Sequence, residues 1–209
     1  MGQVERRVIM ADVEVRNAEK GTPKLVGHGS VFNTETVIAG RFREKVEPGA
    51  FRDSVKEDDI RVLFNHDANY VLGRQSAGTA TVVEDGNGLR YEADVNPNDP
   101  QAMSVAAKVQ RRDVTGSSFS FTIESDDDEE WIAPDKRGGL PLRVIKRAKV
   151  FDVGPVTFPA YVQAEASARS LTRADELTQA EVRAVEMAER SAALAAMDAA
   201  LAERKAWRS

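Results

Sequence analysis

The sequence predicts a protein of the α+β class, with one mostly antiparallel core domain and a C-terminal helical extension. Three observations lead there: several short segments alternate between apolar and polar residues, a Gly-rich turn separates two of them, and helical spacing is confined to two segments. Alternation places successive side chains on opposite faces of a strand, whereas a spacing of three or four lines one face of a helix. At 209 residues we expect a domain over 1–165 and a helical arm over 166–209.

Composition excludes several kinds of partner and chemistry. The net charge of -5 creates no field that would gather nucleic acid or anionic lipid, and no stretch approaches the roughly 18 apolar residues that a membrane-spanning helix needs. The absence of cysteine removes thiol catalysis, disulfides and thiolate metal sites. We therefore expect no nucleic-acid or membrane partner, no cofactor and no metal.

The first third of the chain contains four segments with the character of strands. They span 4–16, 25–32, 41–46 and 60–64. The first two are expected to pair, and Pro48 ends the third before a short helix to about Val55. The fourth delivers His66 just past its end, where a rigid scaffold can hold a functional side chain still.

The clearest local signals follow in the middle of the chain. Segments 79–84 and 89–95 flank Asp85-Gly86-Asn87-Gly88, whose residues tolerate the positive φ angles of tight hairpin turns. Asp99 and Pro100 then form a helix start, and apolar residues continue at helical spacing to Gln110.

Aromatic and hydroxyl residues alternate in one short run, Gly116 to Phe121, which is the central segment of this chain. Alternation points Phe119, Phe121 and Ile123 to the core, with Ser117 on the same face. The opposite face carries only hydroxyls, from Ser118, Ser120 and Thr122. Such a row either hydrogen-bonds its neighbours or lines a cleft, where a serine beside a histidine can become a nucleophile.

The structure of the last third of the chain is predicted from its charged residues, its prolines and a helix-capping motif. Six carboxylates lie in 124–130 without the ligand spacing of a calcium loop, so we expect a solvated loop. Residues 140–152 predict one long strand, and prolines 155 and 159 argue against a central strand after it. Thr178 and Glu181 fit a capping box, which predicts a helix from about 179 to 205 with a thin, Ala-rich apolar stripe.

Only two histidines are available to any histidine-dependent mechanism. His28 lies within a Gly-flanked strand, where a structural role is expected, whereas His66 follows an apolar strand and is the better candidate for a general base. A metal-dependent hydrolase is disfavoured because no paired ligand spacing accompanies His66.

Four segments, in this order, resemble the tailed-phage prohead maturation proteases. They are Glu47 to Phe51 (EPGAF), Leu63 to Asp67 (LFNHD) with Leu72-Gly73, Gly116 to Phe121 (GSSFSF) and Val150 to Tyr161 (VFDVGPVTFPAY). The similarity covers about residues 25–162. It implies a serine endopeptidase with a compact β-barrel flanked by helices, as in herpesvirus assemblin.

On that resemblance Ser118 matches the nucleophile, His66 the base and Asp152 the acid of a catalytic triad. The family commonly has methionine and glycine where this chain has Ser117 and Ser120, and often glutamate where it has Asp152. The imidazole would accept the serine proton while the carboxylate fixes its tautomer.

The resemblance also implies the biological setting. The enzyme would cleave the scaffold, or the scaffolding extension of the major capsid protein, and then itself, acting first in the host cytoplasm and then inside the procapsid. Its partners would be that capsid protein, its scaffolding segment and further copies of this chain. The alternative is a non-enzymatic capsid-assembly module of the same lineage, with the helix serving association.

Overall fold

Strands dominate the part of the chain that the structure describes. The computed structural model describes residues 3–9, 13–16, 22–134, 138–158 and 166–206. The first elements are β1 (Glu5–Ile9), β2 (Glu14–Arg16), β3 (Lys24–Val31), β4 (Thr36–Ile38), β5 (Phe42–Val46), α1 (Ser54–Glu57), β6 (Arg61–Phe64) and β7 (Asp67–Arg74). The remaining ones are β8 (Ala80–Glu84), β9 (Gly88–Asp94), α2 (Pro100–Gln110), β10 (Gly116–Thr122), the 3-10 turn η1 (Asp126–Asp128), β11 (Glu129–Ile132), β12 (Leu142–Ile145), β13 (Lys149–Val156) and α3 (Ala168–Ala206).

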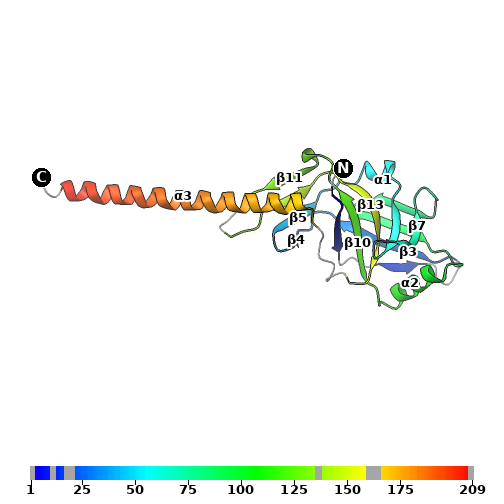
Figure 1. The fold of residues 1–209 in the computed structure, drawn as a ribbon. Coiled ribbons are helices and arrows are strands. Elements are labelled where there is room, and N and C mark those ends of the chain that lie inside the picture. The colour runs from blue at the N-terminus through cyan, green and yellow to red at the C-terminus, as the bar shows by residue number, and fades with distance from the viewer. Residues whose placement is uncertain (1–2, 10–12, 17–21, 135–137, 159–165, 207–209) are drawn as a thin grey trace.

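These strands form three sheets, and most of their pairings are antiparallel. The first sheet has the order β1-β10-β13-β6-β7, the second β11-β12-β5-β4 and the third β2-β3-β9-β8. The β12–β5 and β13–β6 pairs are parallel. The α+β class is therefore confirmed. Figure 1 shows the sheets gathered at one end of the molecule and α3 extending away from them.

None of the three sheets formed by the described strands closes on itself, so the predicted barrel is not confirmed. The first sheet ends at β1 and β7, which are not hydrogen-bonded to each other. The third sheet instead packs across it: a Cβ added to Gly29 of β3 would lie 3.0 Å from the Val153 side chain of β13. The main core fills the space between these two sheets and includes buried side chains of α2.

The hairpin predicted around residues 85–88 is confirmed as β8–β9, but its turn closes in an unexpected way. No positive φ is used at Gly86 or Gly88. The Asp85 carboxylate instead accepts hydrogen bonds from the backbone N–H groups of Asn87 (2.8 Å) and Gly88 (2.9 Å). Gly88 is needed for another reason, because a Cβ there would lie 1.9 Å from the Ser30 carbonyl oxygen.

Helix α2 also begins where the sequence indicates. The Asp99 carboxylate accepts hydrogen bonds from the N–H groups of Gln101 (2.8 Å) and Ala102 (3.3 Å), and Pro100 occupies the first turn. This is the arrangement that satisfies the free donors at a helix N-terminus.

The prediction for residues 140–152 and the prolines after them was wrong. Two strands, β12 and β13, replace the single long one, and β13 is the central strand of the first sheet although it contains Pro155. Its parallel pairing with β6 is made by Asp152 and Val153, so the missing N–H of Pro155 interrupts no pair there. Pro159, the second proline of that prediction, and Ala160 and Tyr161 of the resemblance lie outside the described residues.

The acidic run is only partly the solvated loop that its charge suggested: Glu124, Asp126, Asp127 and Glu130 are exposed, whereas Asp128 and Glu129 belong to the fold. Asp128 is buried, and its carboxylate accepts a hydrogen bond from the Ser125 N–H (3.0 Å) to close η1. Glu129 begins β11 and pairs with buried Arg143. The charge of Glu129 is paired with the buried Arg143 guanidinium on the neighbouring strand. Residues next to Glu129 in the sequence gave no sign of this pairing.

Helix α3 begins at Ala168, eleven residues before the predicted start at about residue 179. Ser167 accepts the Ser170 N–H at 3.1 Å and caps the helix, whereas Thr178 lies inside it and donates its hydroxyl to the Ala174 carbonyl (2.9 Å). No Pro or Gly separates the two capping signals, so the helix continues through the second. The helix predicted from about residue 179 to 205 therefore lies entirely within α3.

Candidate active site

The first sheet carries a strand that is buried on both faces. Every residue of β10 is buried, and Phe119 and Phe121 lie with ring centroids 4.9 Å apart in the core. Ser117 shares that face and donates its hydroxyl to the Tyr91 hydroxyl at 3.0 Å. The alternation inferred from the sequence therefore holds, and it leaves Ser118 and Ser120 together on the other face.

The turn between β6 and β7 holds His66 in a narrow range of positions. Phe64 pairs with Asp67, so the loop has two residues, and Asn65 and His66 have φ angles of 56° and 57°. Positive φ at both positions defines the type I′ hairpin turn, whose twist matches that of the flanking strands. The turn is a tight hairpin rather than an open loop.

Asn65 ties this turn to the end of β13. Its backbone N–H donates to the Pro155 carbonyl at 3.0 Å, and its side-chain oxygen accepts the Thr157 N–H at 2.8 Å. Its side-chain amide also donates to the Thr157 hydroxyl at 3.1 Å. These three bonds connect the His66 turn to the strand that carries Asp152.

Asp152 lies on β13 directly opposite Ser120 of β10. The register shifts immediately afterwards, because Phe121 pairs with Val150 and Phe151 is the extra residue of a bulge. Bulges of this kind redirect side chains and are frequent beside active sites. Here the bulge keeps Phe121 and Val150 in the core while Asp152 shares the hydroxyl face.

The structure brings Ser118 of β10, Asp152 of β13 and His66 of the β6–β7 turn together in one sheet. The Ser118 hydroxyl oxygen lies 2.7 Å from His66 Nε2, and His66 Nδ1 lies 2.6 Å from an Asp152 carboxylate oxygen. Ser118 is 1% exposed and the His66 side chain 7%. Such a chain of contacts, shielded from water, can transfer a proton from the hydroxyl to the ring.

His28, Lys146 and Arg147 contact acidic residues other than Asp152. His28 Nε2 contacts Asp85 at 2.9 Å, in keeping with the structural role expected of it. Lys146 pairs with Glu130 at 2.8 Å and Arg147 with Asp128 at 3.3 Å, so these charges balance acidic neighbours.

One residue of the site was missed by sequence reasoning. The Ser120 hydroxyl donates a hydrogen bond to the second carboxylate oxygen of Asp152, the one that His66 does not contact. From the sequence, Ser120 was expected on the hydroxyl face and as a departure from the family pattern, but no role beside Asp152 was predicted for it. The signal was nevertheless present, since alternation places Ser120 on the same face as Ser118.

The strand beside Ser118 also depends on a glycine. Gly154 pairs with Ser118 in the ladder, and a Cβ on Gly154 would lie 1.9 Å from the Leu63 carbonyl oxygen. The close approach of β13 to β6 therefore requires glycine at this position.

A buried ionic cluster connects the first and second sheets behind this site. Arg143 Nη1 lies 2.8 Å from a Glu5 carboxylate oxygen and 3.0 Å from Glu44, and Arg7 Nη2 lies 2.6 Å from Glu5. Burial alone would raise the pKa of Glu5, but Arg143 and Arg7 outweigh it and lower that pKa to about 2 from its ordinary 4.5. The Ser170 hydroxyl of α3 also donates to Glu5, at 3.1 Å.

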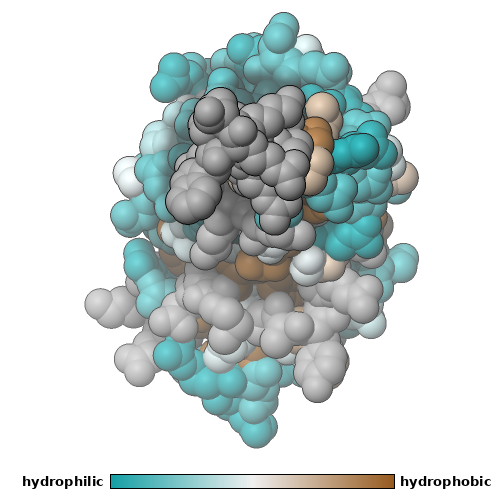
Figure 2. All heavy atoms as spheres, turned by 90° about the vertical axis from the view of Figure 1, so that its left-hand side faces the viewer, coloured by the Kyte–Doolittle hydropathy of each residue, from teal (hydrophilic) through white to brown (hydrophobic). Residues whose placement is uncertain are grey.

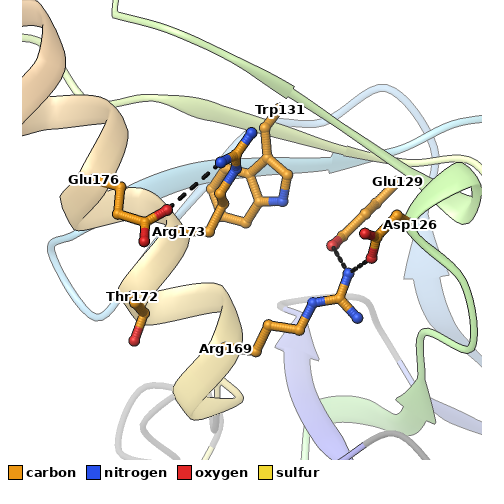
Figure 3. Close-up of a pocket in the computed structure, with 7 residues that line it drawn as sticks. All are labelled: Asp126, Glu129, Trp131, Arg169, Thr172, Arg173 and Glu176. Carbon is orange, nitrogen blue, oxygen red and sulfur yellow. Dashed lines mark hydrogen bonds and ion pairs between the residues drawn. The ribbon is translucent and has the colours of Figure 1, made fainter.

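A separate pocket of about 530 Å³ lies where α3 leaves the sheets. Figure 3 shows Arg169 directed at Asp126 and Glu129, and Arg173 directed at Glu176 beside Trp131. The lining residues are Asp126, Glu129, Trp131, Arg169, Thr172, Arg173 and Glu176. None of them belongs to the Ser118 site, and their charges are largely paired with one another.

The described part of the chain also lacks a metal-binding cluster and a helix that could span a membrane. It contains no group of three or more His, Asp or Glu side chains arranged to hold a metal ion. Nor does any of its helices combine the length and apolar character that crossing a bilayer requires.

Comparison with known proteins gave one match. A family model described as caudovirus prohead serine protease matches residues 11–179. No curated protein sequence and no solved structure matches the chain significantly.

Proposed function

Because the chain belongs to the caudovirus prohead serine protease family, a family of capsid maturation proteases, we propose that Ser118, His66 and Asp152 are its catalytic triad. The observation that supports the triad most directly is the 2.7 Å contact between the Ser118 hydroxyl and His66 Nε2. The 2.6 Å contact between His66 Nδ1 and Asp152 supports the order of roles.

The proposed reaction is hydrolysis of a peptide bond within a chain, through an acyl-enzyme. Ser118 Oγ attacks the scissile carbonyl carbon while its proton passes to His66 Nε2. The C–N bond then breaks, and the same proton is given to the leaving amine. A water molecule attacks the ester, again losing a proton to Nε2, and Ser118 regains its proton as the acid product leaves. Asp152 holds the ring and stabilises its protonated form.

The proposed substrates are the scaffold or the scaffolding extension of the major capsid protein, followed by the protease itself. Further copies of this chain are therefore both partners and substrates. We place the protein in the host cytoplasm before assembly and inside the procapsid afterwards. Family membership supports this setting, because a prohead is the immature capsid.

Helix α3 is proposed to be an arm of the protease, with the domain over 1–165 and the arm over 166–209. Leu171 and Ala174 pack against Phe42 and Trp131 of the second sheet, and Arg41 pairs with Asp175. Beyond these turns the helix exposes Met187 (72%), Leu194 (54%) and Met197 (60%). Exposed apolar side chains on a projecting helix support a role in binding.

Figure 2 views the molecule from the side to which the arm extends. Hydrophilic residues cover most of the periphery there, and a smaller hydrophobic area is visible near the centre.

One observation favours a second candidate, a non-enzymatic capsid-assembly module. Ser118 is only 1% exposed, so a peptide reaches its hydroxyl only after the covering residues move. A buried hydroxyl satisfied by a histidine is also what a binding module would contain.

Expression of the wild type beside Ser118→Ala decides between the two candidates. We expect the wild type to shorten itself and Ser118→Ala to keep its full mass, as measured by intact mass spectrometry. Ser117→Ala is the matched control, because it removes the neighbouring buried hydroxyl from the opposite face of β10 and should still self-truncate. Identical full-length masses for the wild type and Ser118→Ala would support the assembly module instead.

A further inference from the structure

Ser118 and Ser120 lie on either side of the His66–Asp152 pair. Ser118 contacts His66 Nε2, and Ser120 donates to the Asp152 oxygen that is not bonded to His66. The four side chains therefore form one continuous chain of hydrogen bonds. The last contact is not needed for the proton transfer itself, which raises the question of what it does.

A carboxylate on a short side chain is not positioned by one hydrogen bond. The torsion about the Cβ–Cγ bond of aspartate is broad, so a single bond to His66 leaves the carboxylate free to rotate. A second bond to the other oxygen removes that freedom, because both oxygens then have fixed partners. Ionised carboxylates accept several hydrogen bonds, so the two donors do not compete for one site.

The backbone positions Ser120 for this contact. Ser120 and Asp152 are direct partners in the antiparallel β10–β13 ladder, and the bulge begins immediately after them. Directly paired residues have their Cβ atoms about 4.5–5.5 Å apart, within reach of a serine hydroxyl and an aspartate carboxylate. Ser120 is 2% exposed and Asp152 9%, so water competes little for either group.

We propose that Ser120 is a positioning residue of the protease, which holds the Asp152 carboxylate in the orientation that aligns His66 with Ser118. Ser120 does not touch the substrate and takes no part in proton transfer. The proposal rests on the triad proposed above, and it adds a fourth side chain to it.

The test measures kcat and KM on a peptide that reproduces the self-cleavage site mapped in the wild type by mass spectrometry. Ser120→Ala should lower kcat roughly tenfold, the scale of one hydrogen bond to a charged group, with KM changed less than about twofold. Ser120→Cys, which is nearly isosteric and keeps a weak donor, should give an intermediate kcat.

Thr122→Val is the matched control for loss of a buried hydroxyl. Thr122 lies two residues further on the same face of β10, and its hydroxyl donates to the Gln3 carbonyl at 3.4 Å, away from Asp152. We expect its kcat to equal that of the wild type. An equal loss of kcat in Thr122→Val and Ser120→Ala would mean that the strand, and not the carboxylate, is affected, and would overturn the proposal.

A double-mutant cycle separates positioning from a purely structural role. In the Asp152→Ala background, Ser120→Ala should change the residual kcat less than about twofold, because no carboxylate remains to be held. A tenfold loss in that background would overturn the proposal, as would an unchanged kcat of Ser120→Ala in the otherwise wild-type protein. Failure of the proposed function is distinguishable, since the wild type itself would then cleave nothing.

Discussion

Replacing Glu5 by glutamine tests whether the buried ionic cluster stabilises the fold. Glu5→Gln keeps the shape of the side chain and removes the charge that faces Arg143 and Arg7. The pKa of Glu5 is about 2 in the folded protein, against an ordinary value of 4.5. This difference corresponds to about 3 kcal/mol of folding free energy, at about 1.4 kcal/mol for each pH unit.

The sign of the pH dependence follows from the lowered pKa. The unfolded chain takes up the Glu5 proton first, so this contribution is fully present above pH 4.5 and is lost as the pH falls towards 2. At neutral pH we expect Glu5→Gln to unfold at a urea concentration lower by roughly 1.5 M, for an m-value of about 2 kcal/mol/M. Near pH 2 the two proteins should converge.

Glu14→Gln is the control for this measurement, because Glu14 pairs with Arg16 on the surface and its side chain is 50% exposed. Its urea midpoint should stay close to that of the wild type, since exposed ion pairs contribute little. Equal urea midpoints for Glu5→Gln and the wild type at neutral pH would refute the reasoning, and so would a difference between them that persists unchanged at pH 2.

The remaining predictions concern packing and the arm. Gly154→Ala should lower stability by about 3 kcal/mol and Tm by roughly 6–12 °C in a thermal melt, because its Cβ would overlap the Leu63 carbonyl; an unchanged melt would contradict this. Tyr91→Phe removes the acceptor of the Ser117 hydroxyl and should lower Tm by roughly 2–4 °C while self-truncation continues. Deleting residues 179–209 should preserve peptide hydrolysis but reduce the number of protease molecules per particle, counted by quantitative mass spectrometry; full incorporation would argue against a binding arm.

The deletion begins at residue 179 because the first turns of α3 belong to the packed structure. Leu171 and Ala174 contribute to the second hydrophobic cluster, and Ser170 contacts Glu5. A deletion from residue 171 would expose that cluster and confuse lost stability with lost binding.

Several features could be predicted because neighbouring residues determine them. Asp99 and Pro100 start α2 through contacts within one helical turn, and the β8–β9 hairpin is closed by Asp85 and residues beside it. Alternation likewise assigns Phe119 and Ser118 to opposite faces of β10, whatever packs on them. In each case the relevant interactions span only a few positions.

Other features depend on residues far apart in the sequence, and there the local pattern misled. The charge of 124–130 suggested that the whole run is solvated, and most of it is exposed, but Arg143 pairs with Glu129 within the fold. Pro155 suggested a strand end, but it lies within β13, past Asp152 and Val153, the residues that pair with β6. The helical capping signal at Thr178 was overridden by an earlier cap at Ser167.

By itself, the sequence determined the α+β class, the family resemblance and the face of β10 on which the hydroxyls lie, because periodicity and motifs are local properties. Only the tertiary structure decided that the His66 turn is a positive-φ hairpin bound to β13, and that Ser120 faces Asp152 across a bulged ladder. Strand order and register join residues 32 to 92 positions apart. Such pairings arise from the packing of whole sheets, which no short stretch of sequence specifies.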